Sequence, residues 1–101
     1  MMQYYHFELD FNAPESIVIY RQNMEAVPSA FQRGLYEYMG ELDITNPEQG
    51  FILMNDPDVK RPLPNAPSMS KCDVLIDRAN NIAYFCASIG FIKIPIPAGV
   101  N

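Results

Sequence analysis

The sequence predicts an α+β fold, a single domain over residues 1–101 in which one main helix packs on a mainly antiparallel β-sheet of about five or six strands. Three observations lead to this expectation. Polar and apolar residues alternate near the N-terminus, apolar residues recur at helical spacing after Val27, and residues 71–97 consist mostly of β-forming residues interrupted by turn residues. A chain of 101 residues also has the usual length of one domain.

The composition is that of a folded acidic protein. With 49% hydrophobic and 19% charged residues, the chain lies outside the range of disordered proteins. Its formal charge of −5, with Lys60 and Arg61 as the single adjacent basic pair, argues against direct nucleic-acid binding, which requires clustered basic residues. The apolar runs are too short for a membrane span or a signal peptide, so we expect a cytoplasmic protein without membrane contact.

Residues 3–11 have the alternating pattern of a β-strand. Because successive side chains of a strand point to opposite faces, we expect one face to contact the core and the other to face solvent. The core face would carry Tyr5, Phe7, Leu9 and Phe11, and the solvent face Tyr4, His6, Glu8 and Asp10.

Two structures are open for the segment that follows. Residues 16–21, SIVIYR, are rich in β-branched residues, which favours a second strand in a hairpin with the first. The alternative is a helix that begins at Asn12, with Glu15 completing an N-x-x-E capping box. We prefer the strand.

The strongest helical signal begins at Val27 and Pro28 and continues to Met39, since proline suits the first turn of a helix. Gly40 then stands where a C-terminal glycine cap is expected. Gly34 inside this helix lowers helix stability by about 1 kcal/mol relative to alanine. It could mark a position where the helix backbone approaches a strand closely. The stripe expected to lie on the sheet consists of Val27, Phe31, Leu35, Tyr38 and Met39.

The middle of the chain predicts a turn, a short strand and a long loop. Residues 46–50 carry turn residues, and residues 51–54, FILM, are wholly apolar, which favours a buried strand. Residues 55–70 contain four prolines and form the expected loop. Within it, Arg61 and Pro64 belong to an R-x-x-P-x-x-P pattern of the kind that SH3 domains bind, although a proline-stiffened connection is the more ordinary interpretation.

The C-terminal third predicts three strands. Residues 72–77 and 82–88 should form a hairpin around residues 78–81, because asparagine tolerates the positive φ of tight turns. Residues 91–97 should form an edge strand that is protected against pairing, since Pro95 and Pro97 lack an N–H on the same side.

The register of this hairpin decides how the two cysteines lie. A turn centred on Ala79 puts Cys72 opposite Cys86, whereas a two-residue turn at Ala79 and Asn80 puts Cys72 opposite Ala87. In a reducing compartment we expect two small buried thiols rather than a disulfide.

Nothing in the sequence predicts catalysis, a cofactor or a metal site. His6 is the only histidine, and we expect it to be an exposed strand residue without a nucleophile within reach. The chain contains no glycine-rich phosphate loop, H-E-x-x-H or G-x-S-x-G motif. Asn55, Asp56 and Asp58 lack the spacing and closing glutamate of a calcium loop, so we interpret them as turn residues.

These observations favour a non-enzymatic module that binds another protein, such as a small acidic inhibitor, an immunity-type protein or an accessory protein of a phage or mobile element. The alternative is a small-ligand-binding module or a subunit of a small homodimeric enzyme, and homodimer formation stays open. Tyrosine is enriched at protein interfaces, and charged residues beside it would extend such a patch. The interface candidates are Tyr4, His6, Tyr36, Glu37, Glu41, Arg61 and Pro64.

Overall fold

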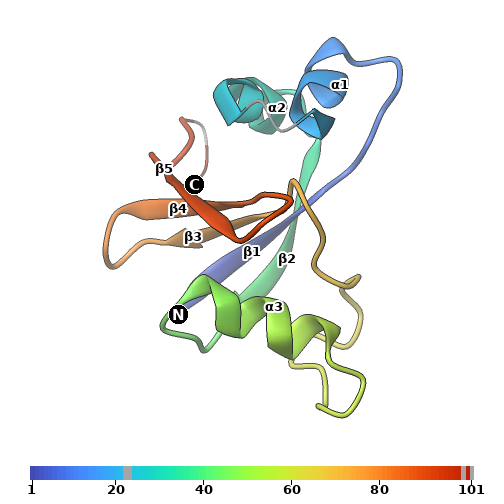
Figure 1. The fold of residues 1–101 in the computed structure, drawn as a ribbon. Coiled ribbons are helices and arrows are strands. Elements are labelled where there is room, and N and C mark those ends of the chain that lie inside the picture. The colour runs from blue at the N-terminus through green and yellow to red at the C-terminus, as the bar shows by residue number, and fades with distance from the viewer. Residues whose placement is uncertain (22–23, 99, 101) are drawn as a thin grey trace.

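The computed structural model describes residues 1–21, 24–98 and 100. Within these residues the chain forms three α-helices, a short 3-10 helix and one five-stranded antiparallel sheet, which confirms the predicted α+β domain (Figure 1). The strand order across the sheet is β2-β1-β3-β4-β5. The elements are β1 (Met2–Phe7), α1 (Pro14–Tyr20), η1 (Met24–Ala26), α2 (Val27–Gln32), β2 (Tyr36–Leu42), α3 (Pro47–Asn55), β3 (Val74–Asp77), β4 (Ile82–Cys86) and β5 (Phe91–Ile94).

Helices cover both faces of the sheet. α1 and α2 pack on one face and α3 packs on the other (Figure 1). The buried side chains accordingly form two clusters, one around Phe7, Val74 and Phe85 and one around Tyr4 and Leu75. The expected solvent face of the first strand is therefore wrong, since Tyr4 is 0% exposed.

The first strand is also shorter than predicted. β1 ends at Phe7, and the following Leu9 and Phe11 are exposed instead of reaching the core, with Phe11 78% exposed. The backbone N–H of Asp10 donates a hydrogen bond of 2.7 Å to Oγ of Ser16, which is buried in the first turns of α1. This bond turns the chain away from the sheet and into the helix.

Residues 16–21 belong mainly to helix α1, so the preferred strand is wrong and a helix is present. Pro14 occupies its first turn, where a missing N–H costs nothing. The helix begins after Ala13, and the capping box proposed at Asn12 does not form among the described residues. Ile19 is fully buried in the core, and this tertiary contact outweighs the local β propensity.

Helix α2 ends well before Met39, so the predicted long helix is wrong. Gly34 has a φ of 74°, a conformation that glycine adopts without steric cost. Its N–H donates to the carbonyl of Phe31 at 3.2 Å, and the N–H of Leu35 donates to the carbonyl of Ala30 at 3.0 Å. These two bonds form a Schellman motif, which terminates a helix.

The chain that follows this motif forms β2 rather than more helix. Gly40, predicted to cap a helix, lies in this strand at an irregularity, because Tyr4 pairs with Gly40 while Tyr5 pairs with Tyr38. One extra residue is therefore accommodated as a β-bulge. Gly40 has a φ of 129°, a backbone conformation that residues with a side chain rarely adopt, so the bulge favours a glycine here. A Cβ at this position would also lie 2.9 Å from Cδ2 of Leu63, so the flexible side chain of Leu63 in the long loop would have to move.

The FILM segment, predicted to be a strand, belongs to helix α3. Oδ1 of Asn46 accepts a hydrogen bond from the Gln49 N–H at 3.0 Å, and Oε1 of Gln49 accepts one from the Asn46 N–H at 3.4 Å. This capping box, with Pro47 in the first turn, starts the helix. Among the described residues, no helix has the length and apolar content that a membrane crossing requires.

The predicted hairpin and edge strand are both present. β3 and β4 pair antiparallel around a turn in which Asn81 has a φ of 55°. β5 pairs with β4 and lies at the edge of the sheet, directly before Pro95.

Both cysteines are buried and they form no disulfide with each other, as expected. The register of β3 and β4 is that of the two-residue turn, but a bulge places Cys72 and Asp73 together opposite Cys86. The Cys72 N–H donates to the Cys86 carbonyl at 2.7 Å, and the Cys86 N–H donates to the Asp73 carbonyl at 2.8 Å. Cys72 packs among the residues on the α1 and α2 face, whereas Cys86 lines a groove beside α3. The two side chains thus lie on opposite faces of the sheet.

The long loop after α3 is present and is fixed at several points. Nδ2 of Asn55 donates to the carbonyl of Met69, and the N–H of Met69 donates back to Oδ1 of Asn55. The guanidinium of Arg61 donates to the Ala66 carbonyl at 2.8 Å and to Oγ of Ser68 at 3.1 Å. Ala66 and Met69 are buried against the α3 side of the sheet, so this loop contributes to the core.

Candidate functional site

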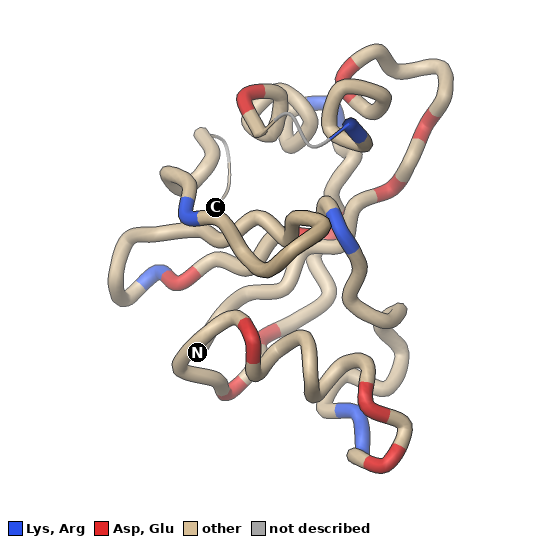
Figure 2. Tube along the Cα trace, in the orientation of Figure 1, with Lys and Arg blue, Asp and Glu red and all other residues tan. Residues whose placement is uncertain are grey.

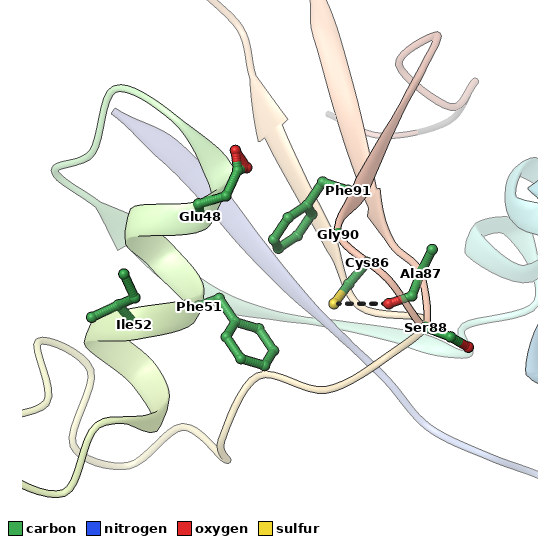
Figure 3. Close-up of a pocket in the computed structure, with 8 residues that line it drawn as sticks. All are labelled: Glu48, Phe51, Ile52, Cys86, Ala87, Ser88, Gly90 and Phe91. Atoms are coloured by element: carbon green, nitrogen blue, oxygen red, sulfur yellow. Dashed lines mark hydrogen bonds between the residues drawn. The ribbon is translucent and has the colours of Figure 1, made fainter.

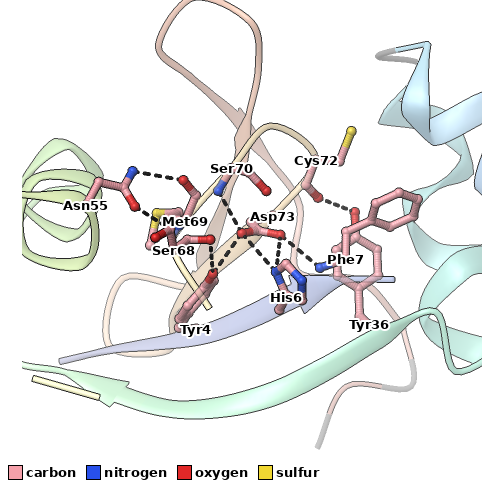
Figure 4. A network of polar contacts seen from close by, with 10 residues as sticks. All are labelled: Tyr4, His6, Phe7, Tyr36, Asn55, Ser68, Met69, Ser70, Cys72 and Asp73. Atoms are coloured by element: carbon pink, nitrogen blue, oxygen red, sulfur yellow. Dashed lines mark hydrogen bonds and ion pairs between the residues drawn. The ribbon is translucent and has the colours of Figure 1, made fainter. Parts of the chain in front are cut away.

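A buried carboxylate lies at the centre of the polar contacts (Figure 4). Asp73 stands in the bulge before β3 and faces the end of β1. Its Oδ2 accepts hydrogen bonds from the Tyr4 hydroxyl at 2.8 Å and the Ser70 N–H at 3.0 Å, and its Oδ1 accepts one from the Phe7 N–H at 2.8 Å. Nδ1 of His6 lies 3.1 Å from Oδ1. Asp73 therefore ties the end of the long loop to β1.

The burial of this cluster changes its electrostatics. Burial raises the pKa of Asp73 above its usual value, while the donors from Phe7, Ser70 and Tyr4 and the nearby His6 oppose that rise. Burial and the adjacent Asp73 carboxylate also raise the pKa of Tyr4, so its hydroxyl stays protonated and donates. The Tyr4 hydroxyl therefore remains a hydrogen-bond donor to Asp73.

His6 is half-buried rather than exposed on the outer face as predicted, with 21% of its side chain accessible. The carboxylate of Asp73 orients the ring through Nδ1, as an orienting acid does in a catalytic dyad. Among the described residues Asp73 is the one polar partner of His6, and no nucleophilic side chain contacts the ring. The arrangement thus positions an imidazole and ties it to the fold.

The residues considered for a cation behave as turn and loop residues. Oδ1 of Asp56 accepts a hydrogen bond from the Asp58 N–H at 2.9 Å, and Asn55 is paired with Met69. Among the described residues, no three His, Cys, Asp or Glu side chains gather closely enough to hold a metal ion.

Both of the predicted interface tyrosines, Tyr4 and Tyr36, are buried, so their expected exposure is wrong. Tyr4 contacts Asp73 inside the α3-side core. The hydroxyl of Tyr36 donates a 2.6 Å hydrogen bond to the Cys72 carbonyl, and its ring stacks on Phe31 at a centroid distance of 4.3 Å. Burial raises the pKa of Tyr36 as well, which keeps this donor protonated.

The remaining interface candidates are distributed along β2 and the long loop. Glu37 and Glu41 are both exposed, but they lie on opposite faces of β2 rather than one helical turn apart. Pro64 is exposed and lines a groove of about 320 Å³ together with Glu37, so these two residues are brought together. Arg61 is held within its own loop by Ala66 and Ser68.

A second groove, of about 340 Å³, lies between α3 and the β4–β5 turn (Figure 3). Phe51 and Ile52 contribute from the helix and Phe91 from β5, with Cys86 between them. Burial raises the pKa of the Cys86 thiol to about 12, so it remains neutral and adds to the apolar lining. Glu48 adds a carboxylate at the N-terminal end of α3.

Large apolar side chains around this groove are unusually exposed. Phe51 is 42% exposed, Ile52 is 56% exposed, and Ile89, at the tip of the adjacent turn, is 93% exposed. The sequence analysis missed them because it interpreted FILM as a buried strand. The signal that would have revealed them is the N-P-E-Q start of a helix followed by more apolar residues than one buried face requires.

The basic residues are spread over separate parts of the fold instead of gathering on one element (Figure 2). Lys60 and Arg61 lie in the loop after α3, and Arg33 forms an ion pair with Glu15 at 3.5 Å. The absence of direct nucleic-acid binding stays a prediction.

Comparisons of the chain with protein-family models, with curated proteins and with solved structures found no match.

Proposed function

We propose that this chain is a non-enzymatic protein-binding module, of the small acidic inhibitor, immunity or accessory type, whose partner binds over α3 and the β4–β5 turn. The observation that carries the proposal is the exposure of Phe51, Ile52 and Ile89 around one apolar groove. Exposed apolar side chains that gather in one place mark interaction surfaces, whereas isolated ones are common on any protein.

The fold leaves a large part of these three side chains uncovered. α3 is anchored by its capping box and by Gly50 and Met54, which face the core. Covering an exposed side chain of the size of Ile52 with a partner is worth up to about 1.5–3 kcal/mol. Selection for binding accounts for their exposure better than selection for folding.

The test compares two variants with matched chemistry. Ile52→Gln keeps a good helix former and removes the apolar contact, whereas Phe11→Gln removes an even more exposed apolar side chain that does not line the groove. Each would be used to capture proteins from the host, with the melting temperature recorded. We expect one partner to be captured by the wild type and by Phe11→Gln and to be lost with Ile52→Gln, while all three melt alike.

Two results would contradict the proposal. One is capture of the same partner by Ile52→Gln at the wild-type level. The other is the absence of any partner that depends on an apolar residue of this groove.

The second candidate function is binding of a small ligand, because a groove of about 340 Å³ falls within the size range of ligand pockets. In that case the protein purified from its host would carry a small molecule visible by native mass spectrometry, and Ile52→Gln would release it. A homodimeric enzyme subunit would instead show twice the expected mass in solution at micromolar concentration.

The proposal places the protein in the cytoplasm. Cys72 and Cys86 are both buried on opposite faces of the sheet without a disulfide between them, a state that is typical of proteins in reducing compartments. It includes no cofactor and no metal.

A further inference from the structure

The two edges of the sheet differ in how they are protected. β5 is an edge strand of four residues and is followed by Pro95 and Pro97, which cannot donate to another strand. β2, at the opposite edge, has seven residues and contains no proline. Its outer side is therefore the accessible one for strand pairing.

The hydrogen bonds identify which backbone groups of β2 point outward. The backbone N–H of Phe7 donates to Asp73 on the β3 side. The backbone N–H of Phe7 therefore points away from Tyr36, its neighbour in β2. The backbone N–H of Glu8 donates to the Leu35 carbonyl at 2.7 Å, which shows that the backbone carbonyl of Leu35 points toward the β1 side. Since backbone groups alternate along a strand, Tyr36 and Tyr38 direct their N–H and C=O groups away from the sheet. Within the described residues, no other group bonds to these four atoms.

We infer that β2 binds an extended, basic segment of another protein, which adds a sixth strand to the sheet. The carboxylates of Glu37 and Glu41 on β2 and of the exposed Asp43 just after it give this edge a negative charge. No ion pair neutralises any of the three among the described residues. Strand addition takes its affinity from the backbone bonds and its specificity from the side chains opposite each position.

Charge argues against a second copy of this chain as the occupant. An antiparallel pair of β2 strands that uses both Tyr36 and Tyr38 would match Tyr36 of one copy with Tyr38 of the other. This register puts Glu37 directly opposite Glu37 of the second copy, and like charges in that position are destabilising. A lysine or arginine opposite Glu37 removes the repulsion, which favours a different protein.

The structure also limits the length and pattern of the bound segment. The bulge at Gly40 interrupts the strand, so regular pairing covers Tyr36 to Met39. The matching segment has a basic residue opposite Glu37 and an aromatic or β-branched residue opposite Tyr38, whose ring is 50% exposed beside Tyr5. The groove shared by Glu37 and Pro64 gives room for the basic side chain.

The experiment uses a labelled eight-residue peptide of alternating lysine and valine. Two control peptides are an alternating glutamate and valine sequence and a sequence of equal positive charge in which proline replaces valine. We expect the lysine and valine peptide alone to bind, and the amides of Tyr36 and Tyr38 to exchange with solvent at least about tenfold more slowly in its presence. Equal binding of the proline peptide would overturn the inference, because it would show attraction by charge without strand pairing.

A pair of variants tests the backbone contact directly. Tyr38→Pro removes the outward N–H, whereas Tyr38→Thr removes the same ring and keeps the N–H. Neither breaks a bond to β1, because that N–H points outward. We expect Tyr38→Pro to bind the peptide about threefold to tenfold more weakly than Tyr38→Thr. Equal binding by the two variants would overturn the inference, and should Tyr38→Pro not fold, the exchange rates of the wild type decide it.

A second pair tests the charge. Glu37→Gln is expected to weaken binding about twofold to fivefold, and Asp58→Asn, which removes an exposed acid from the loop after α3, should leave it unchanged. Equal effects of the two changes, or dimerisation of the wild type through β2, would overturn the assignment of a basic partner. Since β2 lies at the opposite edge of the sheet from the groove of β4, β5 and α3, this inference is tested separately from the proposed function.

Discussion

Removing the Asp73 carboxylate should destabilise the fold severely. Two of its donors, the Phe7 N–H and the Tyr4 hydroxyl, are buried. In Asp73→Ala the Phe7 N–H would lose its partner, and the Tyr4 hydroxyl would keep only a long contact of 3.5 Å with the Ser68 carbonyl. An unsatisfied buried donor costs about 1–3 kcal/mol, so the two together cost about 2–6 kcal/mol. Small domains are stable by about 5–15 kcal/mol, and Asp73→Ala is therefore expected to be partly unfolded at 37 °C. Asp73→Asn keeps one acceptor oxygen and should lose about half as much.

The cost of Asp73→Asn should depend on pH, because burial raises the pKa of Asp73 in the folded state above the value of 3.8 for an ordinary aspartate. Between these two pKa values the folded chain binds more protons than the unfolded chain. The contribution of Asp73 to stability is thus fully present below pH 3.8 and decreases as the pH rises through the folded-state pKa. The asparagine variant lacks this titration, so the stability difference between wild type and variant should shrink as the pH increases.

The assay is urea unfolding followed by circular dichroism at a series of pH values from about 3.5 upward, for the wild type and Asp73→Asn. The exposed Asp43→Asn serves as the control and should show no comparable trend. Repeating the series in a His6→Gln background removes the imidazole whose Nδ1 lies 3.1 Å from the carboxylate. A difference that grows with pH would refute the reasoning, because it would mean that the four donors outweigh burial.

Three further substitutions test local features by thermal or urea unfolding. Gly34→Ala should cost about 1 kcal/mol or more, since its φ of 74° disfavours a side chain; an unchanged melting temperature would show that the Schellman motif does not fix the end of α2. Asn46→Ala should cost about 1 kcal/mol through loss of the capping box, with Asn46→Ser as the control that keeps a cap. Tyr36→Phe should cost about 1–3 kcal/mol because the Cys72 carbonyl loses its donor, and a neutral result would show that water replaces the hydroxyl.

The sheet at the C-terminal end could be predicted because its signals are local. Turn residues separate the β-forming runs, Asn81 adopts the positive φ that its residue type tolerates, and Pro95 marks the edge. The alternation at the N-terminus was also interpreted correctly as a strand. It did not reveal that both faces are covered, because Tyr4 is compatible with either a core or a surface position.

The helices were harder to predict because they are short. α1, α2 and α3 have seven, six and nine residues, which gives about two turns each and too few positions for helical spacing to show. The residues at the ends of these helices indicate where each helix begins and stops. The Asn46 and Gln49 pair fits a capping box, and Gly34 fits a C-terminal cap, but each was given a different role in the sequence analysis.

The central contact of the candidate site could not be predicted at all. Asp73 is separated by more than 60 residues from Tyr4, His6 and Phe7, and it meets them because β1 and β3 are neighbours in the sheet. The sequence does contain one indication, which is a carboxylate placed between Cys72 and a run of apolar β-forming residues. A charge in such a position requires hydrogen-bond partners, but their identity depends on the tertiary fold.

The end of α2 at Gly34, which makes the predicted long helix wrong, also produces the exposed edge of β2. Because Gly34 ends α2, the residues from Tyr36 onward are free to pair with β1, and their other side becomes an edge. Glu37, which would be a solvated charge on the predicted helix, then lies on this edge strand, between the two residues whose backbone groups point outward. Natural proteins place inward or flanking charges on such strands to prevent self-association. On this acidic edge the Glu37 carboxylate would repel a second copy of the chain and would attract a basic strand. The same carboxylate would therefore both oppose self-association and select the partner.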